Sequence, residues 1–421
     1  MKRFPITWCA LSLLIGSMGS GWAGEMAPVG ASVGELLELA RRMNPELAAA
    51  ALDRDAAKAR VEGSDGWPDP KLQITFDEIS KNDAGWPSRT ATYKYTLIQE
   101  IPGWGKRQAK REIAEAGQRE AEGQLQERVA EVVMRVKSAY ADYHRVHLSM
   151  DATSEWIQVM RALVELARVR YAQGMGGQSE ATSAEAERGG MSAELLRMEK
   201  ERHRIRARLN ALVNRSPDAP LVEHPQLRPI PSDEALRFAP LLERAMGSNP
   251  GLMMSQARLE GAEGEERLTG KSWIPDLELG FGLVDRKDEG MKDGFEAMVN
   301  LNLPVVTGWR RAGEREAEAK RGAARARWNA ARLQLESALR EALLSLEEAR
   351  LVEKSADEVL LPQARVAVRS SLKGYETGIN EASMVLDAVQ RLKKFQIERL
   401  KAQFDQQVRL AEIERLVGGE L

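Results

Sequence analysis

The chain has 421 residues, of which 29% are charged and 5% aromatic, and its formal net charge is -2 at pH 7. This near-neutral balance gives no indication of a nucleic-acid partner. The abundance of Ala, Glu, Arg and Leu is typical of long helices and coiled coils, which argues against a multidomain globular enzyme.

The first 23 residues have the features of a secretory signal peptide. Lys2 and Arg3 supply a positive start, residues 6–15 form a short apolar core, and small residues favour cleavage after Ala23. No later run of 18 or more apolar residues indicates a transmembrane helix. The single cysteine, Cys9, lies within the apolar core, so we expect an exported chain without a lipid anchor, a disulfide or a cysteine metal site.

The remaining sequence repeats itself at a spacing of roughly 204 residues, which is far longer than the period of a solenoid and predicts a duplicated domain. We expect a first repeat over 24–220 and a second over 221–421. Five landmarks return in the same order: Asn44-Pro45 as Asn249-Pro250, Trp67-Pro68-Asp69 as Trp273-Ile274-Pro275-Asp276, Gly103-Trp104 as Gly308-Trp309, Tyr171-Ala172-Gln173-Gly174 as Tyr375-Glu376-Thr377-Gly378, and Leu212-Val213 as Leu416-Val417.

Each repeat is predicted to begin with a helix that Asn44 or Asn249 caps and in which proline takes the first helical position. Two strands follow in each repeat, because apolar residues alternate with polar or small ones. We expect these strands over 71–76, 90–99, 276–284 and 295–303.

A very long helix is expected after each strand pair, over 104–172 and 309–375, because apolar residues recur at heptad spacing. At 1.5 Å per residue, each helix would extend roughly 100 Å. Pro362 should kink or interrupt the second long helix. Glycine-containing turns should end both rods, and returning helices are expected over 177–214 and 379–417.

The strands require partner chains. Four strands of membrane-crossing length would leave open edges, and each unpaired backbone group costs several kcal/mol in a bilayer. A closed barrel removes the edges, but four strands are too few to close one. We therefore expect several copies to contribute four strands each, and the long helices to pack on helices of neighbouring copies.

Tryptophans mark all four expected strand–helix junctions; they are Trp67, Trp104, Trp273 and Trp309. Aromatic girdles of membrane barrels occur at such positions, and we favour this interpretation over the alternative that each Trp only packs a turn. Lys106-Arg107 and Arg310-Arg311 follow two of the tryptophans, and we expect these basic groups to meet anionic lipid head groups.

The order helix, strand pair, long helix, Tyr-x-x-Gly turn and returning helix, repeated once, resembles the TolC family of outer-membrane efflux proteins over nearly the whole mature chain. The most specific segment is Tyr375-Glu376-Thr377-Gly378 followed by Val385-Leu386-Asp387-Ala388. The run from Gly103 to Arg107 is similar to the heavy-metal branch of that family.

The resemblance implies a mainly α fold with a small β part. A duplicated, long α-helical coiled-coil barrel would adjoin four strands per chain, which contribute to a trimeric 12-stranded transmembrane β-barrel. It further implies a homotrimer in the outer membrane, with its helical part in the periplasm. The partners would be a periplasmic adaptor (membrane fusion) protein and an inner-membrane pump of the RND type or a similar one.

The resemblance places the tunnel entrance beyond the second Tyr-x-x-Gly turn. Asp387 matches an acidic position of the closed entrance, and three copies near the axis would attract cations. The position three residues earlier, often acidic in the family, is Met384. Glu180, Glu185 and Glu381 could add charge, but for them we favour a simpler interpretation, since acids at helix starts interact well with the helix dipole. The tip turns themselves contain Tyr171, Gly174, Tyr375 and Gly378.

No residue pattern indicates catalysis, a cofactor or a metal site. His144 and His147 lie one helical step apart without a third nearby ligand. Two functions remain: a passive outer-membrane duct for small toxic solutes or metal cations, or a periplasmic coiled-coil adaptor or scaffold of an export complex. We expect the duct, because an adaptor's strands would form small soluble domains without aromatic junctions.

Overall fold

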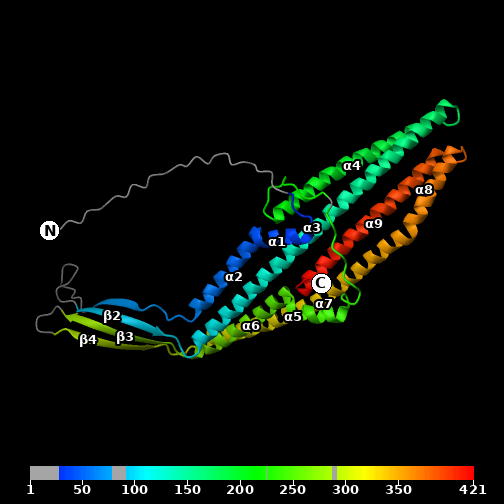
Figure 1. The fold of residues 1–421 in the computed structure, drawn as a ribbon. Helices are drawn as coiled ribbons and strands as arrows, with labels where there is room; N and C mark the ends of the chain where they lie inside the picture. The colour runs from blue at the N-terminus through cyan, green and yellow to red at the C-terminus, as the bar shows by residue number, and fades with distance from the viewer. Residues whose placement is uncertain (1–27, 78–91, 224, 287–291) are drawn as a thin grey trace, which may run out of the picture.

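The computed structural model describes residues 28–77, 92–223, 225–286 and 292–421, which form an elongated molecule with a small sheet at one end (Figure 1). The expectation of a mainly α fold with a small β part is confirmed. The expected signal peptide, Cys9 included, lies outside the described residues. Among the described residues, none of the helices combines the length and the apolar character needed to cross a membrane.

The sheet is antiparallel, and its strands follow chain order: β1 (Lys71–Asp77), β2 (Thr92–Ile101), β3 (Leu277–Arg286) and β4 (Gly294–Leu301). β2 pairs with β3 across the boundary between the repeats. In the described part of the chain, β1 and β4 each pair on one side only, so the sheet has two open edges. The fourth strand ends at Leu301, two residues before the expected end.

Repeat 1 contributes α1 (Val33–Met43), α2 (Pro45–Ser64), α3 (Lys106–Ala172) and α4 (Gln178–Leu212). Repeat 2 contributes α5 (Phe238–Ser248), α6 (Pro250–Gly270), the short 3-10 helix η1 (Lys271–Trp273), α7 (Gly308–Ser355), α8 (Leu361–Glu376) and α9 (Ala382–Val417).

The two expected asparagine caps are present, and each asparagine also forms a hydrogen bond to the last helix of its own repeat. Asn44 Oδ1 accepts the backbone N–H of Glu46 at 2.8 Å, while its Nδ2 donates to the Leu212 carbonyl at 2.9 Å. Asn249 Oδ1 accepts the N–H of Leu252 at 2.8 Å, and its Nδ2 donates to the Leu416 carbonyl at 2.9 Å.

The interruption expected at Pro362 takes the form of a π-helical turn, η2 (Ala356–Leu360), between α7 and α8. Proline lacks an N–H, and its ring clashes with the carbonyl four residues earlier in a regular helix. A π turn changes the hydrogen-bond register just before the proline and so accommodates it. α3 runs for 67 residues without such a turn, so the long helices of the two repeats differ here.

The long helices form a layer (Figure 1). Near the sheet, the order across the layer is α2, α3, α6 and α7; farther away it is α4, α3, α9 and α7–α8. Three clusters of buried apolar side chains hold this layer together, one where α1 packs on α3 and α4, one where α5 packs on α7 and α9, and one between the four helices that approach the far end.

Candidate functional site: a two-faced sheet and a helical tip

The sheet has an exposed apolar face because the strand register aligns the alternating residues of all four strands. Leu72 lies opposite Leu97, Tyr95 opposite Leu283, and Phe281 opposite Ala297. The large apolar side chains of this face are each at least 39% exposed; they are Leu72, Ile74, Phe76, Tyr95, Leu97, Leu279, Phe281, Leu283, Phe295, Val299 and Leu301. A contiguous apolar surface of this kind marks contact with a membrane or a protein.

The opposite face is polar and carries cross-strand ion pairs. Lys94 lies 3.0 Å from Asp77 and 3.7 Å from Glu296. Lys71 lies 3.4 Å from Glu100 and 3.7 Å from Glu278. These two groups contain four carboxylates and two ammonium groups, and with Arg286, which the register places on the same face, this face keeps a slight excess of acidic residues.

Two glycines, Gly280 and Gly282, leave the middle of the polar face of β3 without side chains. A Cβ atom at Gly282 would lie 2.6 Å from Thr96 Oγ1 and 2.9 Å from the Tyr95 carbonyl oxygen. A Cβ atom at Gly280 would lie 3.0 Å from Met298 Cε. At Gly282 a larger residue would therefore meet both a side chain and the backbone of β2, so it could fit only if the neighbouring strand shifted.

Three of the four junction tryptophans are more than half exposed: Trp104 at 88%, Trp309 at 60% and Trp67 at 56%. The fourth, Trp273, is partly buried, and its indole N–H donates to Glu314 at 2.6 Å. Large exposed indoles therefore surround the end of the sheet that faces the helices.

The basic residues beside these tryptophans are mostly engaged within the chain, contrary to the expectation that they meet lipid head groups. Lys106 forms an ion pair with Asp276 at 2.8 Å, and Arg107 donates to the Asp65 carbonyl at 2.7 Å. Arg310 is 6% exposed, donates to two backbone carbonyls and lies 4.4 Å from the centre of the Trp309 ring. These three side chains hold the strand–helix junctions in place.

The far end of the rods is a tip made of two turns. Gly174 and Gly378 have φ angles of +73° and +80°, in the left-handed region that glycine adopts most easily. Each glycine thereby ends its helix, α3 or α8, in the common left-handed cap. The two tyrosines of the Tyr-x-x-Gly segments differ, because Tyr171 is 51% exposed whereas Tyr375 is fully buried.

Tyr375 lies where the two tip turns meet. Its hydroxyl donates to Glu180 on α4 at 2.9 Å, and the guanidinium of Arg170 at the end of α3 lies 4.5 Å from its ring centre. Arg170 also donates to the backbone carbonyls of Tyr375 and Met175. Burial and the neighbouring Glu180 raise the pKa of Tyr375 to about 12, so the phenol keeps its proton, and can donate this hydrogen bond, even in mildly alkaline solution. Sequence reasoning missed Arg170, which belongs to no recognisable motif.

Three of the other predicted entrance residues are exposed on α9 or just before it, whereas Glu185 lies partly buried on α4. Met384 is 55% exposed, and Asp387 is exposed with no side-chain partner among the described residues. Glu381 precedes α9 and accepts a hydrogen bond from the Ser383 hydroxyl at 3.4 Å. Glu185 pairs with Arg188 on its own helix. The structure therefore brings Glu180 to Tyr375 and leaves Asp387 free.

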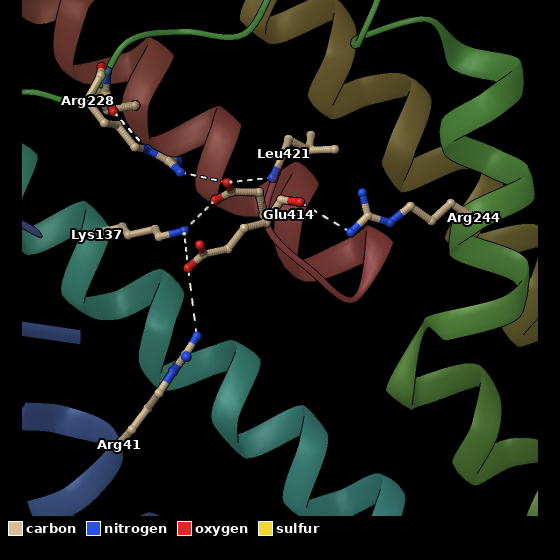
Figure 2. Close-up of polar contacts among 8 residues, drawn as sticks. Arg41, Lys137, Arg228, Arg244, Glu414 and Leu421 are labelled. Atoms are coloured by element: carbon tan, nitrogen blue, oxygen red, sulfur yellow. Dashed lines mark hydrogen bonds and ion pairs between the residues drawn. The ribbon is translucent and has the colours of Figure 1, made fainter. Parts of the chain in front are cut away.

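A buried ionic cluster joins the repeats where α3 crosses the end of α9 (Figure 2). Glu414 and Lys137 are each 4% exposed and lie 2.9 Å apart. Arg228, from the segment between the repeats, lies 2.6 Å from the other oxygen of Glu414. Burial raises the pKa of Glu414, but the hydrogen bonds and charges of Arg228 and Lys137 outweigh burial and lower it overall.

The last residues of the chain close one side of this cluster (Figure 2). The backbone N–H of Leu421 donates to Glu414 at 3.2 Å, and Glu420 accepts from Lys137 at 3.4 Å. Arg244 on α5 donates to the Glu420 carbonyl at 3.2 Å. No sequence motif predicted this cluster, whose members are up to 283 positions apart.

The two neighbouring histidines have separate partners. Nδ1 of His144 lies 2.7 Å from the Pro225 carbonyl oxygen, and His147 packs edge-on against Tyr143 with ring centres 4.5 Å apart. Within the described ranges, no three His, Cys, Asp or Glu side chains are grouped as metal ligands would be.

Comparisons with known proteins agree with this architecture. A family model described as "Outer membrane efflux protein" matches residues 36–215 and 241–419. The outer membrane protein VceC of Vibrio cholerae has a similar structure, with a TM-score of 0.79 at 20% identity over 93% of this chain and 97% of that one. No curated protein sequence matches this chain.

Two further solved structures are similar. The Campylobacter jejuni CmeC outer membrane channel has a TM-score of 0.77 at 14% identity, over 100% of this chain and 94% of that one. The open state of the Neisseria gonorrhoeae MtrE outer membrane channel has a TM-score of 0.76 at 16% identity, over 93% of this chain and 90% of that one.

Proposed function

Because this chain belongs to the outer membrane efflux protein family, we propose that it forms the passive outer-membrane duct of a tripartite efflux system. The observation that carries the proposal is the exposed apolar face of a sheet with two open edges, at one end of a long layer of helices. Exposing such an apolar surface to water is unfavourable, whereas contact with lipid is not, so we do not expect this surface on a soluble adaptor or scaffold.

Several copies are needed to make the duct. If β4 of one copy pairs with β1 of the next, the edges disappear and the apolar face turns towards lipid. The acidic polar face then lines the water-filled interior. Three copies give the twelve strands that the resemblance implies, and the helical layers close into a tube in the periplasm. Trp67, Trp104 and Trp309 would form the aromatic girdle on the periplasmic side of the membrane.

The tip would be the entrance and the gate. With three copies, Asp387 supplies an acidic ring that attracts cations. Opening would separate the α8–α9 turn from the α3–α4 turn, which breaks the hydrogen bond from Tyr375 to Glu180 and the contacts of Arg170. A periplasmic adaptor and an inner-membrane pump of the RND type would supply the energy, and the cargo would be small toxic solutes or metal cations.

Localisation and conductance test the proposal together. Cell fractionation should place the chain in the outer membrane as a heat-sensitive oligomer, and the purified oligomer should conduct ions in planar bilayers. Asp387→Ala should weaken block by divalent cations, whereas Glu318→Ala, which removes an exposed acid on α7 near the sheet, should leave block unchanged. A soluble periplasmic monomer would refute the duct, and identical block in both variants would refute the acidic ring.

A further inference from the structure

A cavity lies beside the buried ionic cluster, where α3 of repeat 1 packs against α9 of repeat 2. We infer that it binds a small amphiphilic anion, a carboxylate with an unbranched alkyl chain. The volume of the cavity is about 350 Å³, within the range of roughly 300–1,000 Å³ that is usual for small-molecule sites. The cavity lies within one copy of the chain, so this inference goes beyond the proposed duct and does not depend on it.

The floor of the cavity is a row of aliphatic side chains on one face of α3. Leu125, Val129 and Val133 follow one another at intervals of four residues and form a continuous apolar surface. All three are only partly buried, and Ala130 and Ala411 line the cavity beside them. The row extends about 12 Å along the helix axis. An alkyl chain of medium length, such as that of decanoate, can therefore lie along the row and cover its apolar surface.

The end of this row meets the ionic cluster, whose acids are already neutralised (Figure 2). Lys137, one turn beyond Val133, lies 2.9 Å from Glu414 and 3.4 Å from Glu420. Arg228 lies 2.6 Å from the other oxygen of Glu414. Both carboxylates that line the cavity are thus paired with cations of the chain, so neither is available to a cationic ligand.

Arg415 supplies the positive charge for an anion. It follows Glu414 on α9, lines the same cavity and is partly buried. Within the described ranges its guanidinium has no ion-pair or hydrogen-bond partner, whereas Arg41 and Lys137, the other cations of the lining, are both paired. A guanidinium matches a carboxylate well, because the two groups can form two parallel hydrogen bonds. The cavity therefore combines an apolar floor with one spare cation.

The position of the cavity keeps it accessible. α3 and α9 are the inner helices of the layer (Figure 1), so the cavity opens between them and not at a flank of the layer. The lining also includes Gly418, Gly419 and Glu420, which follow α9 at the end of the chain. The cavity is thus complete only when both repeats are packed together, and a ligand in it should stabilise that packing by linkage.

Photoaffinity labelling tests the site in the intact chain. The probe is decanoic acid with a diazirine near the end of its alkyl chain, added to the purified protein in lipid nanodiscs. Mass spectrometry of the digested chain should place the label on α3 between Leu125 and Val133. Decanoate should compete with the probe, whereas decyltrimethylammonium, a cation of the same chain length, should not. Label confined to the apolar face of the sheet, or equal competition by both amphiphiles, would overturn the inference.

Variants of Arg415 test the choice of an anion. Arg415→Gln should weaken competition by decanoate about tenfold, as expected for the loss of one hydrogen bond to a charged group. Arg415→Lys keeps the charge and should retain most of the affinity. Arg391→Gln removes an exposed arginine elsewhere on α9 and is the control. Wild-type affinity in Arg415→Gln would contradict the assignment.

Filling the cavity tests the place of the alkyl chain. Val129→Phe adds volume over the apolar floor and should abolish labelling of α3. Val366→Phe, at a position on α8 that is 65% exposed, is the control and should label as the wild type does. Helical circular dichroism shows whether each variant folds, and if Val129→Phe does not, the Arg415 variants decide. A folded Val129→Phe variant that is still labelled between Leu125 and Val133 would refute the site.

Discussion

Replacing Glu414 with Gln should destabilise the fold strongly, because the change removes a buried charge and leaves its partner in place. Lys137, at 4% exposure, would keep only Glu420 at 3.4 Å, and Glu420 is 59% exposed. Removing one partner of a buried ion pair costs about 3–5 kcal/mol. We expect a loss of about 3 kcal/mol in the free energy of unfolding, near the lower end of this range. Glu420 still pairs with Lys137, and the introduced amide can keep some of the hydrogen bonds of Glu414.

A double-mutant cycle measures whether this loss comes from the stranded charge. Adding Lys137→Met to Glu414→Gln removes both charges of the Lys137–Glu414 pair and leaves Arg228, which is 18% exposed and still donates to Gln407, so the double variant should be more stable than the single one. Urea unfolding followed by helical circular dichroism in detergent gives the free energies. Chain concentration must be equal in all samples, because assembly contributes to apparent stability.

A more exposed pair on the same helix serves as the control. Glu412 lies 2.8 Å from Arg409, with side-chain exposures of 30% and 43%. Glu412→Gln should therefore change the free energy of unfolding by less than about 1 kcal/mol. If Glu414→Gln costs no more than this control, or if the double variant is no more stable than the single one, the role assigned to the buried pair is wrong.

The same carboxylate should make stability depend on pH. The pKa of Glu414 is lowered from its ordinary value of 4.5 in the folded state, so its contribution is present above that value and is lost as pH falls through the folded pKa. The stability difference between the wild type and Glu414→Gln should therefore narrow below pH 4.5. A difference that stays constant from pH 7 down to strongly acidic conditions would contradict this linkage.

Three further changes test other parts of the molecule. Gly282→Val should reduce the amount of heat-sensitive oligomer in outer membranes, because the new Cβ would lie 2.6 Å from Thr96 Oγ1. The control is Gly270→Ala, where a Cβ meets nothing within 4 Å and the amount of oligomer should not change. Tyr375→Phe removes the hydrogen bond to Glu180, so it should increase the basal conductance in planar bilayers and lower the free energy of unfolding by about 1 kcal/mol. Tyr171→Phe changes the exposed tyrosine and is the control. Equal conductance of the two variants would argue against a role of the Tyr375 contact in closing the tip. Asn249→Ala should lower the free energy of unfolding by about 2 kcal/mol, because it loses a helix cap and the hydrogen bond to Leu416; an unchanged urea midpoint would count against this estimate.

The sheet was the part of the fold most accessible from the sequence. Side-chain direction alternates in any strand, so the order of apolar and polar residues carries the information locally. The duplication then supplied a second, independent copy of the same pattern. The caps at Asn44 and Asn249 were equally accessible, because Asn-Pro at a helix start has a local physical cause.

Contacts between distant charged residues were not accessible in this way. Lys137 and Glu414 occupy positions in long helices where charged residues are common, and nothing nearby distinguishes them from their exposed neighbours. Arg310 illustrates the same limit, since its sequence context indicated a lipid contact whereas the structure buries it at 6% exposure. Pro362 predicted an interruption, but nothing in the local sequence specified that the interruption would be a π turn.

The junction between sheet and helices also has a mechanical consequence. In a closed ring, each copy fills a sector of a circle, and the same sector angle applies to the barrel and to the helical tube. The two parts are joined tightly: Lys106 holds Asp276 at 2.8 Å, and Gly103 lies so close to Pro275 that a Cβ would stand 2.8 Å from its carbonyl oxygen. In the proposed ring, a twist of the rods that opened the tip would therefore have to be absorbed along the helices before it reached this tight junction. The π turn before Pro362 breaks the regular helical hydrogen-bond register in repeat 2, whereas α3 of repeat 1 has no such break.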